Sequence, residues 1–283
     1  MLLPKSKWGR KAAVGAALAA GLMSVAGPAF AATSASGSEN LTLTAGTLSV
    51  SNVQPGTLTG TVAGTATGTL PSADFADNTG TGAGWNGTIA LSTFSYTGAW
   101  SGSAAATDLA NTTAGSYTGT NDGDTYTVTV GSGATSSSVP FTWTSTYNTT
   151  GGSGTATPGT PAAVGSNGVT IDFSTSTVPA SGDAFQVQVG AQPNSAVSLT
   201  TADGTVTANT GTTSTDPTLV NNATTVAGGG VGTLGTAVKA VSAALGTGMG
   251  SYNVAPGASA VTDAASWAQT YTANAQYTIV SGP

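Results

Sequence analysis

Apolar and small polar residues alternate along most of the chain beyond residue 31. Residues 41–44 (LTLT), 125–130 (TYTVTV) and 185–189 (FQVQV) show this two-residue period. Clusters of Gly, Asn, Asp and Pro interrupt it at short intervals, as turns do. A period of two predicts half-buried antiparallel strands. We therefore expect an all-β protein, built as an antiparallel β-sandwich.

Residues 232–245 (GTLGTAVKAVSAAL) depart from this alternation. Their larger apolar side chains, at positions 234, 238, 241 and 245, recur at helical spacing, which favours one short helix near 234–245. The leading glycines and the β-branched residues favour a pair of strands instead. Both alternatives are open on the sequence alone.

The N-terminus has the layout of an export signal. Four basic residues precede an apolar stretch over 12–26, and a small-residue site ends at Ala31. This layout predicts a signal peptide over residues 1–31, cleaved between Ala31 and Ala32. The apolar stretch is short for a membrane span, so a retained anchor is the lesser alternative. We expect a secreted protein located outside the cell, at the surface or cell wall.

Charge is scarce in the expected mature chain. Of the five basic residues only Lys239 lies beyond Ala31, whereas all eleven acidic residues do. The net side-chain charge of the expected mature chain is therefore −10. Affinity for nucleic acid depends on Lys and Arg, so nucleic acid is not an expected partner. No later apolar stretch has membrane-spanning length, so we expect no membrane partner after signal cleavage.

The chain contains no histidine and no cysteine. This excludes a histidine general base, a thiolate nucleophile, a Cys/His zinc site and a disulfide framework. Lys239 is the only basic side chain left to activate a hydroxyl nucleophile. A wall-active glycosidase would need two carboxylates placed across a cleft, and nothing in the sequence selects such a pair. We therefore expect a protein that is not an enzyme.

The pattern of residues along the chain changes twice beyond the signal peptide. We expect the first part of a β-sandwich over 32–112, a small inserted β module over 113–192, and the second part of the sandwich over 193–283. A plain tandem arrangement is the main alternative, although insertion is tolerated where the ends of an insert lie close together. The middle run, with its NGVTIDF and SGDAF segments, resembles small β modules of bacterial surface and flagellar proteins.

Two blocks bracket this middle run. The first is residues 74–85 (DFADNTGTGAGW) followed by an alternating strand, and the second comprises residues 246–252 and 268–283. Together they resemble the two signatures of WxL-type domains, which are secreted cell-surface domains of Gram-positive bacteria. The resemblance implies a secreted β-sandwich that associates non-covalently with the cell wall through peptidoglycan, often together with other surface proteins.

The residues at the signature positions differ from Trp-x-Leu. The first block has Trp85-Asn-Gly and the second has Tyr277-Thr-Ile279, so we describe the chain as WxL-like. The resemblance makes Trp85 with Gly84, and Tyr277 with Ile279, the candidate wall-binding or ligand-binding residues.

The residues themselves leave two interpretations of Trp85 and Tyr277. Glycines at 80, 82 and 84 permit a tight turn that would deliver Trp85 onto a sheet face, where its ring could stack on a sugar. Alternatively, both aromatics fill the core between the sheets. For Trp100, Trp143 and Trp267 we favour core packing.

Two close carboxylate pairs occur, Asp74 with Asp77 and Asp122 with Asp124. Either could contribute oxygen ligands to Ca²⁺, the one cofactor that the residues suggest. Neither pair lies in a dedicated calcium loop, and Asn-Asp-Gly-Asp is also a hairpin-turn sequence. We favour turns and expect no cofactor, with calcium as the alternative.

These observations predict a secreted, non-enzymatic cell-surface protein that acts in non-covalent cell-wall association or in surface adhesion. Its expected partners are cell-wall peptidoglycan or other surface proteins. The alternative is a subunit of a self-assembling extracellular filament or surface layer, and hence a homo-oligomer. In that case the segment 32–51 would pair with the open sheet edge of a neighbour.

Overall fold

The computed structural model describes residues 41–102, 106–147, 150–192, 197–220 and 225–282. Residues 44–283 form one compact unit, and the chain before them is a separate one. Within the described ranges, the regular structure consists of antiparallel strands and one 3₁₀ turn, η1 (Ala106–Asp108). The predicted all-β antiparallel fold is confirmed. The predicted signal peptide, with Ala31 and Ala32, lies outside the described residues.

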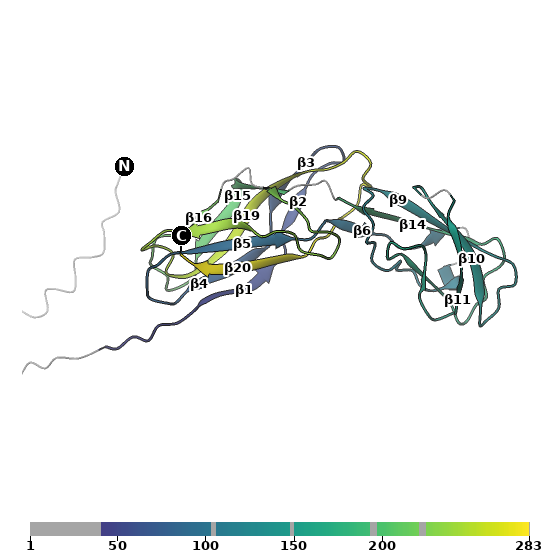
Figure 1. The fold of residues 1–283 in the computed structure, drawn as a ribbon, viewed down its shortest axis with the longest axis horizontal. Helices are drawn as coiled ribbons and strands as arrows, with labels where there is room; N and C mark the ends of the chain where they lie inside the picture. The colour runs from purple at the N-terminus through teal and green to yellow at the C-terminus, as the bar shows by residue number, and fades with distance from the viewer. Residues whose placement is uncertain (1–40, 103–105, 148–149, 193–196, 221–224, 283) are drawn as a thin grey trace, which may run out of the picture. The chain divides into compact units, whose positions relative to one another are not determined.

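Two sheets enclose the first core, and we call this part the host sandwich (Figure 1). One sheet has the strand order β1-β4-β19-β15-β17, with β3 paired to β19 and β2 paired to β3. Its strands are β1 (Leu48–Gln54), β2 (Thr57–Thr59), β3 (Thr65–Thr69), β4 (Ser72–Asp77), β15 (Val197–Ala208), β17 (Thr225–Val226) and β19 (Gly250–Val261). The other sheet has the order β16-β18-β5-β20, formed by β5 (Trp85–Leu91), β16 (Thr218–Leu219), β18 (Val238–Ala243) and β20 (Ala275–Ser281).

Two further sheets enclose the second core, and we call this part the module. The larger has the order β11-β10-β9-β14-β6, with β7 also paired to β14, and the smaller has the order β12-β13-β8. The strands are β6 (Ser95–Thr97), β7 (Ser101–Gly102), β8 (Leu109–Asn111), β9 (Asp124–Val130), β10 (Val139–Ser145), β11 (Gly152–Ala156), β12 (Ala162–Ala163), β13 (Thr170–Phe173) and β14 (Ala184–Ala191).

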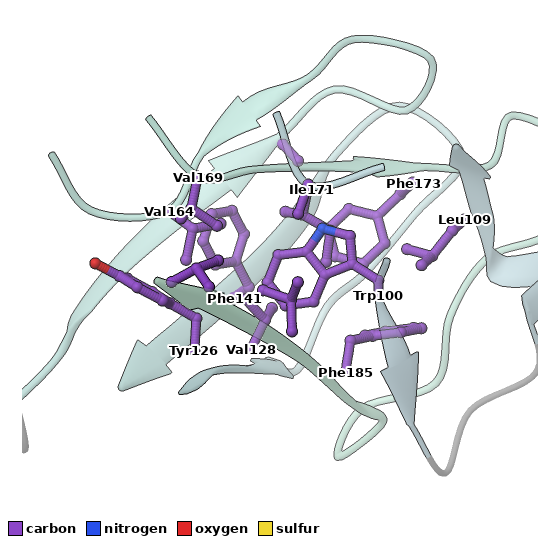
Figure 2. Packing of buried hydrophobic residues seen from close by; sticks show 14 of the residues in the cluster. Trp100, Leu109, Tyr126, Val128, Phe141, Val164, Val169, Ile171, Phe173 and Phe185 are labelled. Atoms are coloured by element: carbon purple, nitrogen blue, oxygen red, sulfur yellow. The ribbon is translucent and has the colours of Figure 1, made fainter. Parts of the chain in front are cut away.

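Aromatic side chains fill the module core. Figure 2 shows them gathered beside Trp100. The Phe173 ring lies 6.3 Å from Phe141 and 5.9 Å from Phe185, measured between ring centroids. The core runs in sequence from Trp100 to Ala191. The indole N–H of Trp100 donates to the carbonyl of Thr170 at 2.8 Å, so this core also contains a residue that precedes position 113. The predicted boundaries at 112/113 and 192/193 stay a prediction.

The burial pattern along the strands explains the two-residue period of the sequence. In β9 the buried positions alternate with half-buried threonines along the whole strand. Each buried side chain thus faces the core, and each threonine faces the outer surface of the sheet. Within the part of the chain described above, no helix is long and apolar enough to cross a membrane.

The short helix near 234–245 is absent, and in place of the alternative pair of strands the structure has one strand in this stretch. Residues 238–243 form β18, which pairs with β5. The pairing register shifts between Lys239 and Val241, so that Ala240 and Val241 are both buried. An irregularity of this kind inserts an extra residue and breaks the period of two. The resulting three-residue spacing between Val238 and Val241 imitates a helical pattern.

Candidate functional site

Trp85 lies in the core of the host sandwich. It begins β5 and is fully buried. Its ring stacks almost parallel to Phe75, with centroids 5.5 Å apart and planes 3° apart. Its indole N–H donates to the carbonyl oxygen of Gly248 at 2.9 Å. With both the ring and the N–H occupied inside the protein, Trp85 has no free face for a sugar, in agreement with the core interpretation.

The glycine-rich turn before Trp85 has the predicted role. Gly80, Gly82 and Gly84 all have positive φ angles, between 63° and 73°. A Cβ on Gly84 would come within 2.5 Å of the carbonyl oxygen of Ala243. Gly84 therefore packs closely against the neighbouring chain and positions Trp85, and it is itself buried.

Tyr277 belongs to the same core. Its ring meets Phe75 edge-on, with centroids 5.5 Å apart and an interplanar angle of 84°. Its hydroxyl donates to the carbonyl oxygen of Pro71, and burial raises the pKa of the phenol. Ile279, two residues along β20, is half-buried against this core. The structure thus brings the two WxL-like blocks together around Phe75, as packing rather than as an exposed binding face.

The other three tryptophans, for which we expected core packing, differ in how deeply they are buried. Trp100 is buried, and Trp143 is partly buried beside Tyr126, with ring centroids 5.9 Å apart. Trp267 is half-buried. Its indole N–H donates to the carbonyl oxygens of Val189 at 3.1 Å and Asp124 at 3.3 Å, so it ties the segment between β19 and β20 to module strands.

Asp74 and Asp77 do not converge on a common site. They are three residues apart in β4 and so project from opposite faces. The carboxylate of Asp74 accepts hydrogen bonds from the amides of Asn253 at 2.8 Å and Asn52 at 2.7 Å, and these lower its pKa. The carboxylate of Asp77 accepts hydrogen bonds from the N–H and the hydroxyl of Thr79, and so it caps the turn that follows β4.

Asp122 and Asp124 begin the first hairpin of the module. Asp124 is 1% exposed, and one carboxylate oxygen accepts the N–H of Thr146 at 2.9 Å, while the other has no partner. Burial, and then the charge of Asp263, raises the pKa of Asp122. The described residues contain no group of three or more acidic side chains placed to hold a metal. Calcium at either pair stays a prediction.

A hollow of about 350 Å³ lies on the outer face of the larger module sheet. It forms beside β14, between β6, β7 and β9. The residues that line it are Tyr96, Gly98, Ala99, Ser101, Thr125, Gln186, Val187 and Gln188. We call it the Tyr96 hollow.

Strand alternation directs the polar side chains into this hollow. Phe185, Val187 and Val189 are buried, whereas Gln186 and Gln188 are exposed on the opposite face. Tyr96 pairs with Gly190, which places its ring on the same face as the two glutamines.

The Tyr96 ring is held from two sides. It packs against Tyr271 with centroids 5.9 Å apart, at a tilt of 54°. A Cβ on Gly98 would come within 2.8 Å of the Tyr96 hydroxyl, so only glycine leaves room for the ring to lie this way. The N–H of Gly98 donates to the carbonyl of Gln188 at 2.8 Å, which fixes the chain beside the hollow.

The side chains that line the Tyr96 hollow are polar but uncharged. One aromatic ring, two carboxamides and two hydroxyls face a single space, and none of these groups is an acid or a base at neutral pH. A second hollow, of about 480 Å³, is lined by residues 211–215, 246, 249 and 250, with no aromatic ring. The Tyr96 hollow is therefore the stronger candidate for binding a sugar.

Sequence reasoning missed this hollow. The FQVQV pattern predicted the half-buried strand correctly. What it lacked was the pairing of residues 95–97 with 189–191, which are far apart in sequence. No local signal identifies such a pair.

Comparison with known protein families, with characterised proteins and with solved structures finds no match to this chain. The resemblance to WxL-type domains therefore stays a prediction, carried by the two sequence blocks alone.

Proposed function

We propose that this is a secreted, non-enzymatic cell-surface protein that associates non-covalently with the cell wall and binds its glycan in the Tyr96 hollow. The observation that carries the proposal is the half-exposed Tyr96 ring beside the exposed carboxamides of Gln186 and Gln188. The signal-peptide layout and the WxL-like blocks support the location.

The chemistry of the hollow suits a neutral sugar. A half-exposed aromatic ring such as that of Tyr96 can gain from contact with the apolar face of a pyranose. A carboxamide has both donors and an acceptor, so it can bond neighbouring sugar hydroxyls in either sense. The lining has no charged side chain, which fits a polysaccharide better than a phosphate-rich polymer.

A single shallow site of this kind gives modest affinity. Wall glycan presents the same unit many times, and several protein copies on one strand raise the overall affinity without any new contact. Wall association through the Tyr96 hollow therefore does not require a deep pocket.

Co-sedimentation with purified peptidoglycan sacculi tests the proposal. The protein is exported by a bacterial host, purified, and compared with Tyr96→Ala and Gln188→Ala. Losing the ring contact removes about 1 kcal/mol or more, so we expect the bound fraction of Tyr96→Ala to fall several-fold.

The matched control is Tyr147→Ala, because Tyr147 is 57% exposed and lies outside the hollow. It should bind like the wild type. Equal binding by folded Tyr96→Ala and wild type would exclude this hollow, and absence of binding by folded wild type would exclude the wall-binding role.

A further inference from the structure

A segment of the host sandwich lies against the module beside the Tyr96 hollow. Residues 262–274 join β19 to β20, which are both host strands, and we call them the connecting segment. The backbone of Ser95, at the start of β6, exchanges two hydrogen bonds with that of Thr272, at 2.8 and 2.9 Å. Because this bridge is antiparallel, the next residue of β6, Tyr96, lies beside Tyr271.

The Tyr271 side chain contacts Tyr96 through its ring and is anchored through its hydroxyl. The two ring centroids lie 5.9 Å apart. The Tyr271 hydroxyl accepts the N–H of Trp267 at 3.0 Å and donates to the carbonyl oxygen of Asp122 at 3.3 Å. Burial raises the pKa of this phenol, so the hydroxyl stays protonated at neutral pH and retains its donor. The Tyr96 ring therefore packs against a side chain that is itself fixed.

A glycine in β14 makes room for this arrangement. Gly190 pairs with Tyr96 and follows Gln188 on the same outer face of the sheet. A Cβ on Gly190 would come within 3.0 Å of the Tyr271 hydroxyl and within 2.4 Å of the carbonyl oxygen of Asp122. Tyr271 thus occupies the space of the missing side chain and covers β14 directly beyond Gln188.

Two further contacts fasten the connecting segment to the module. The indole N–H of Trp267 donates to two module carbonyl oxygens, at 3.1 and 3.3 Å. The hydroxyl of Ser266 accepts a hydrogen bond from the carboxamide of Gln192, which is buried. Neither Trp267 nor Ser266 belongs to the lining of the hollow. The segment therefore acts on the lining through the contact of Tyr271 with Tyr96.

We propose that Tyr271 is a positioning residue for the Tyr96 hollow, and that the connecting segment holds the Tyr96 ring in the orientation in which it stacks on a wall glycan. This inference rests on the proposed function. Tyr96 lies in a strand of only three residues and is half-exposed. Without Tyr271, its ring would be free to adopt other rotamers, and a sugar would have to order it on binding, which costs affinity.

The proposal makes the hollow a site shared between the module and a host segment. A sugar that binds better when the connecting segment is docked must, by thermodynamic reciprocity, also stabilise the docked segment. Occupancy of the hollow should therefore be felt at Trp267, which anchors the segment outside the lining. A merely structural contribution of Tyr271 to folding would not produce this coupling.

Calorimetric titration of the exported protein with a soluble peptidoglycan-derived oligosaccharide tests the positioning role. We expect the dissociation constant of Tyr271→Ala to rise about fivefold. Tyr271→Phe keeps the ring contact and should restore most of the affinity. Thr270→Ala, at an exposed position of the same segment, is the matched control and should bind like the wild type. A purely structural role would lower the urea midpoint of Tyr271→Ala and leave its affinity unchanged.

Solvent exchange of the Trp267 indole proton, followed by NMR, tests the coupling. In the wild type, saturating sugar should slow this exchange, because binding stabilises the docked segment. In Tyr271→Ala, the same sugar should leave the exchange rate unchanged, because the link between Tyr96 and the segment is removed.

The outcomes separate this inference from the function on which it rests. Absence of sugar binding by the folded wild type would overturn both. Wild-type affinity in folded Tyr271→Ala, together with loss of binding in Tyr96→Ala, would overturn the positioning role alone, and so would unchanged exchange at Trp267 in the sugar-bound wild type. If Tyr271→Ala does not fold, Trp267→Phe removes the anchoring indole donor instead, and wild-type affinity in that folded variant would equally overturn the proposal.

Discussion

The indole N–H of Trp85 donates a hydrogen bond to the carbonyl oxygen of Gly248 at 2.9 Å. This bond joins the two sequence blocks that bracket the module. It also explains why Trp85 begins β5 facing inward, since a buried indole N–H needs an acceptor. The residue that the sequence marks most strongly is thus a central structural contact of the host sandwich.

Replacing Trp85 should therefore reduce stability. Trp85→Phe retains a ring beside Phe75 but leaves the Gly248 carbonyl without its donor and the site underfilled. We expect the free energy of unfolding of this variant to fall by about 2 kcal/mol or more, and that of Trp85→Ala to fall by about 4 kcal/mol. Urea denaturation followed by tryptophan fluorescence measures both. Wild-type stability of Trp85→Phe would show that the indole N–H contributes nothing.

Gly248 should be intolerant of a side chain for a related reason. Its φ is +68°, and a Cβ there would collide with the Cβ of Ala243 and lie 2.9 Å from the Trp85 nitrogen. Gly246 has a φ of +77° but open space around it. Gly246→Ala therefore measures the destabilisation caused by the left-handed backbone alone, about 1 kcal/mol in the free energy of unfolding. We expect Gly248→Ala to cost about 3 kcal/mol. Equal thermal midpoints for the two variants would contradict the proposed crowding.

Asp122 should make the protein less stable as the pH rises. Burial first, and then the charge of Asp263, raises its pKa above the ordinary 3.8. The folded state therefore holds this proton more tightly than the unfolded state. Its stabilising contribution is complete below pH 3.8 and is lost as the pH rises through the raised pKa. Asp122→Asn should therefore raise the urea midpoint at neutral pH, by a margin that shrinks on acidification.

Asp74 provides the control of opposite sign. The amide of Asn253, and then that of Asn52, lowers its pKa below 3.8. Its contribution is present above that value and is lost as the pH falls through the lowered pKa. Asp74→Asn should therefore lower the urea midpoint at neutral pH, with a margin that also shrinks on acidification. Changes of the same sign in both variants would refute this assignment.

The strand content could be predicted from the sequence because it depends on local alternation. β9 and β14 both follow the TYTVTV and FQVQV patterns closely. Where that alternation breaks, the sequence leaves helix and strand both open. At β18 a shift of register buries two successive residues, Ala240 and Val241, and only the partner strand β5 distinguishes this from a helical pattern.

The candidate site could not be predicted in the same way. The sequence shows that Trp85 follows a glycine-rich turn, but the burial of Trp85 depends on Phe75 and Gly248, which the sequence does not place beside it. The Tyr96 ring and Gln188 meet only because β6 pairs with β14 across the module. Long-range pairing of this kind leaves no local pattern.

An NMR titration shows directly whether a wall glycan binds in the Tyr96 hollow. The exported, isotope-labelled protein is titrated with a soluble peptidoglycan-derived oligosaccharide. We expect chemical-shift changes concentrated on Tyr96 and on the side-chain amides of Gln186 and Gln188, and the loss of those changes in Tyr96→Ala. Shift changes concentrated elsewhere, or none at saturating sugar, would exclude binding in this hollow.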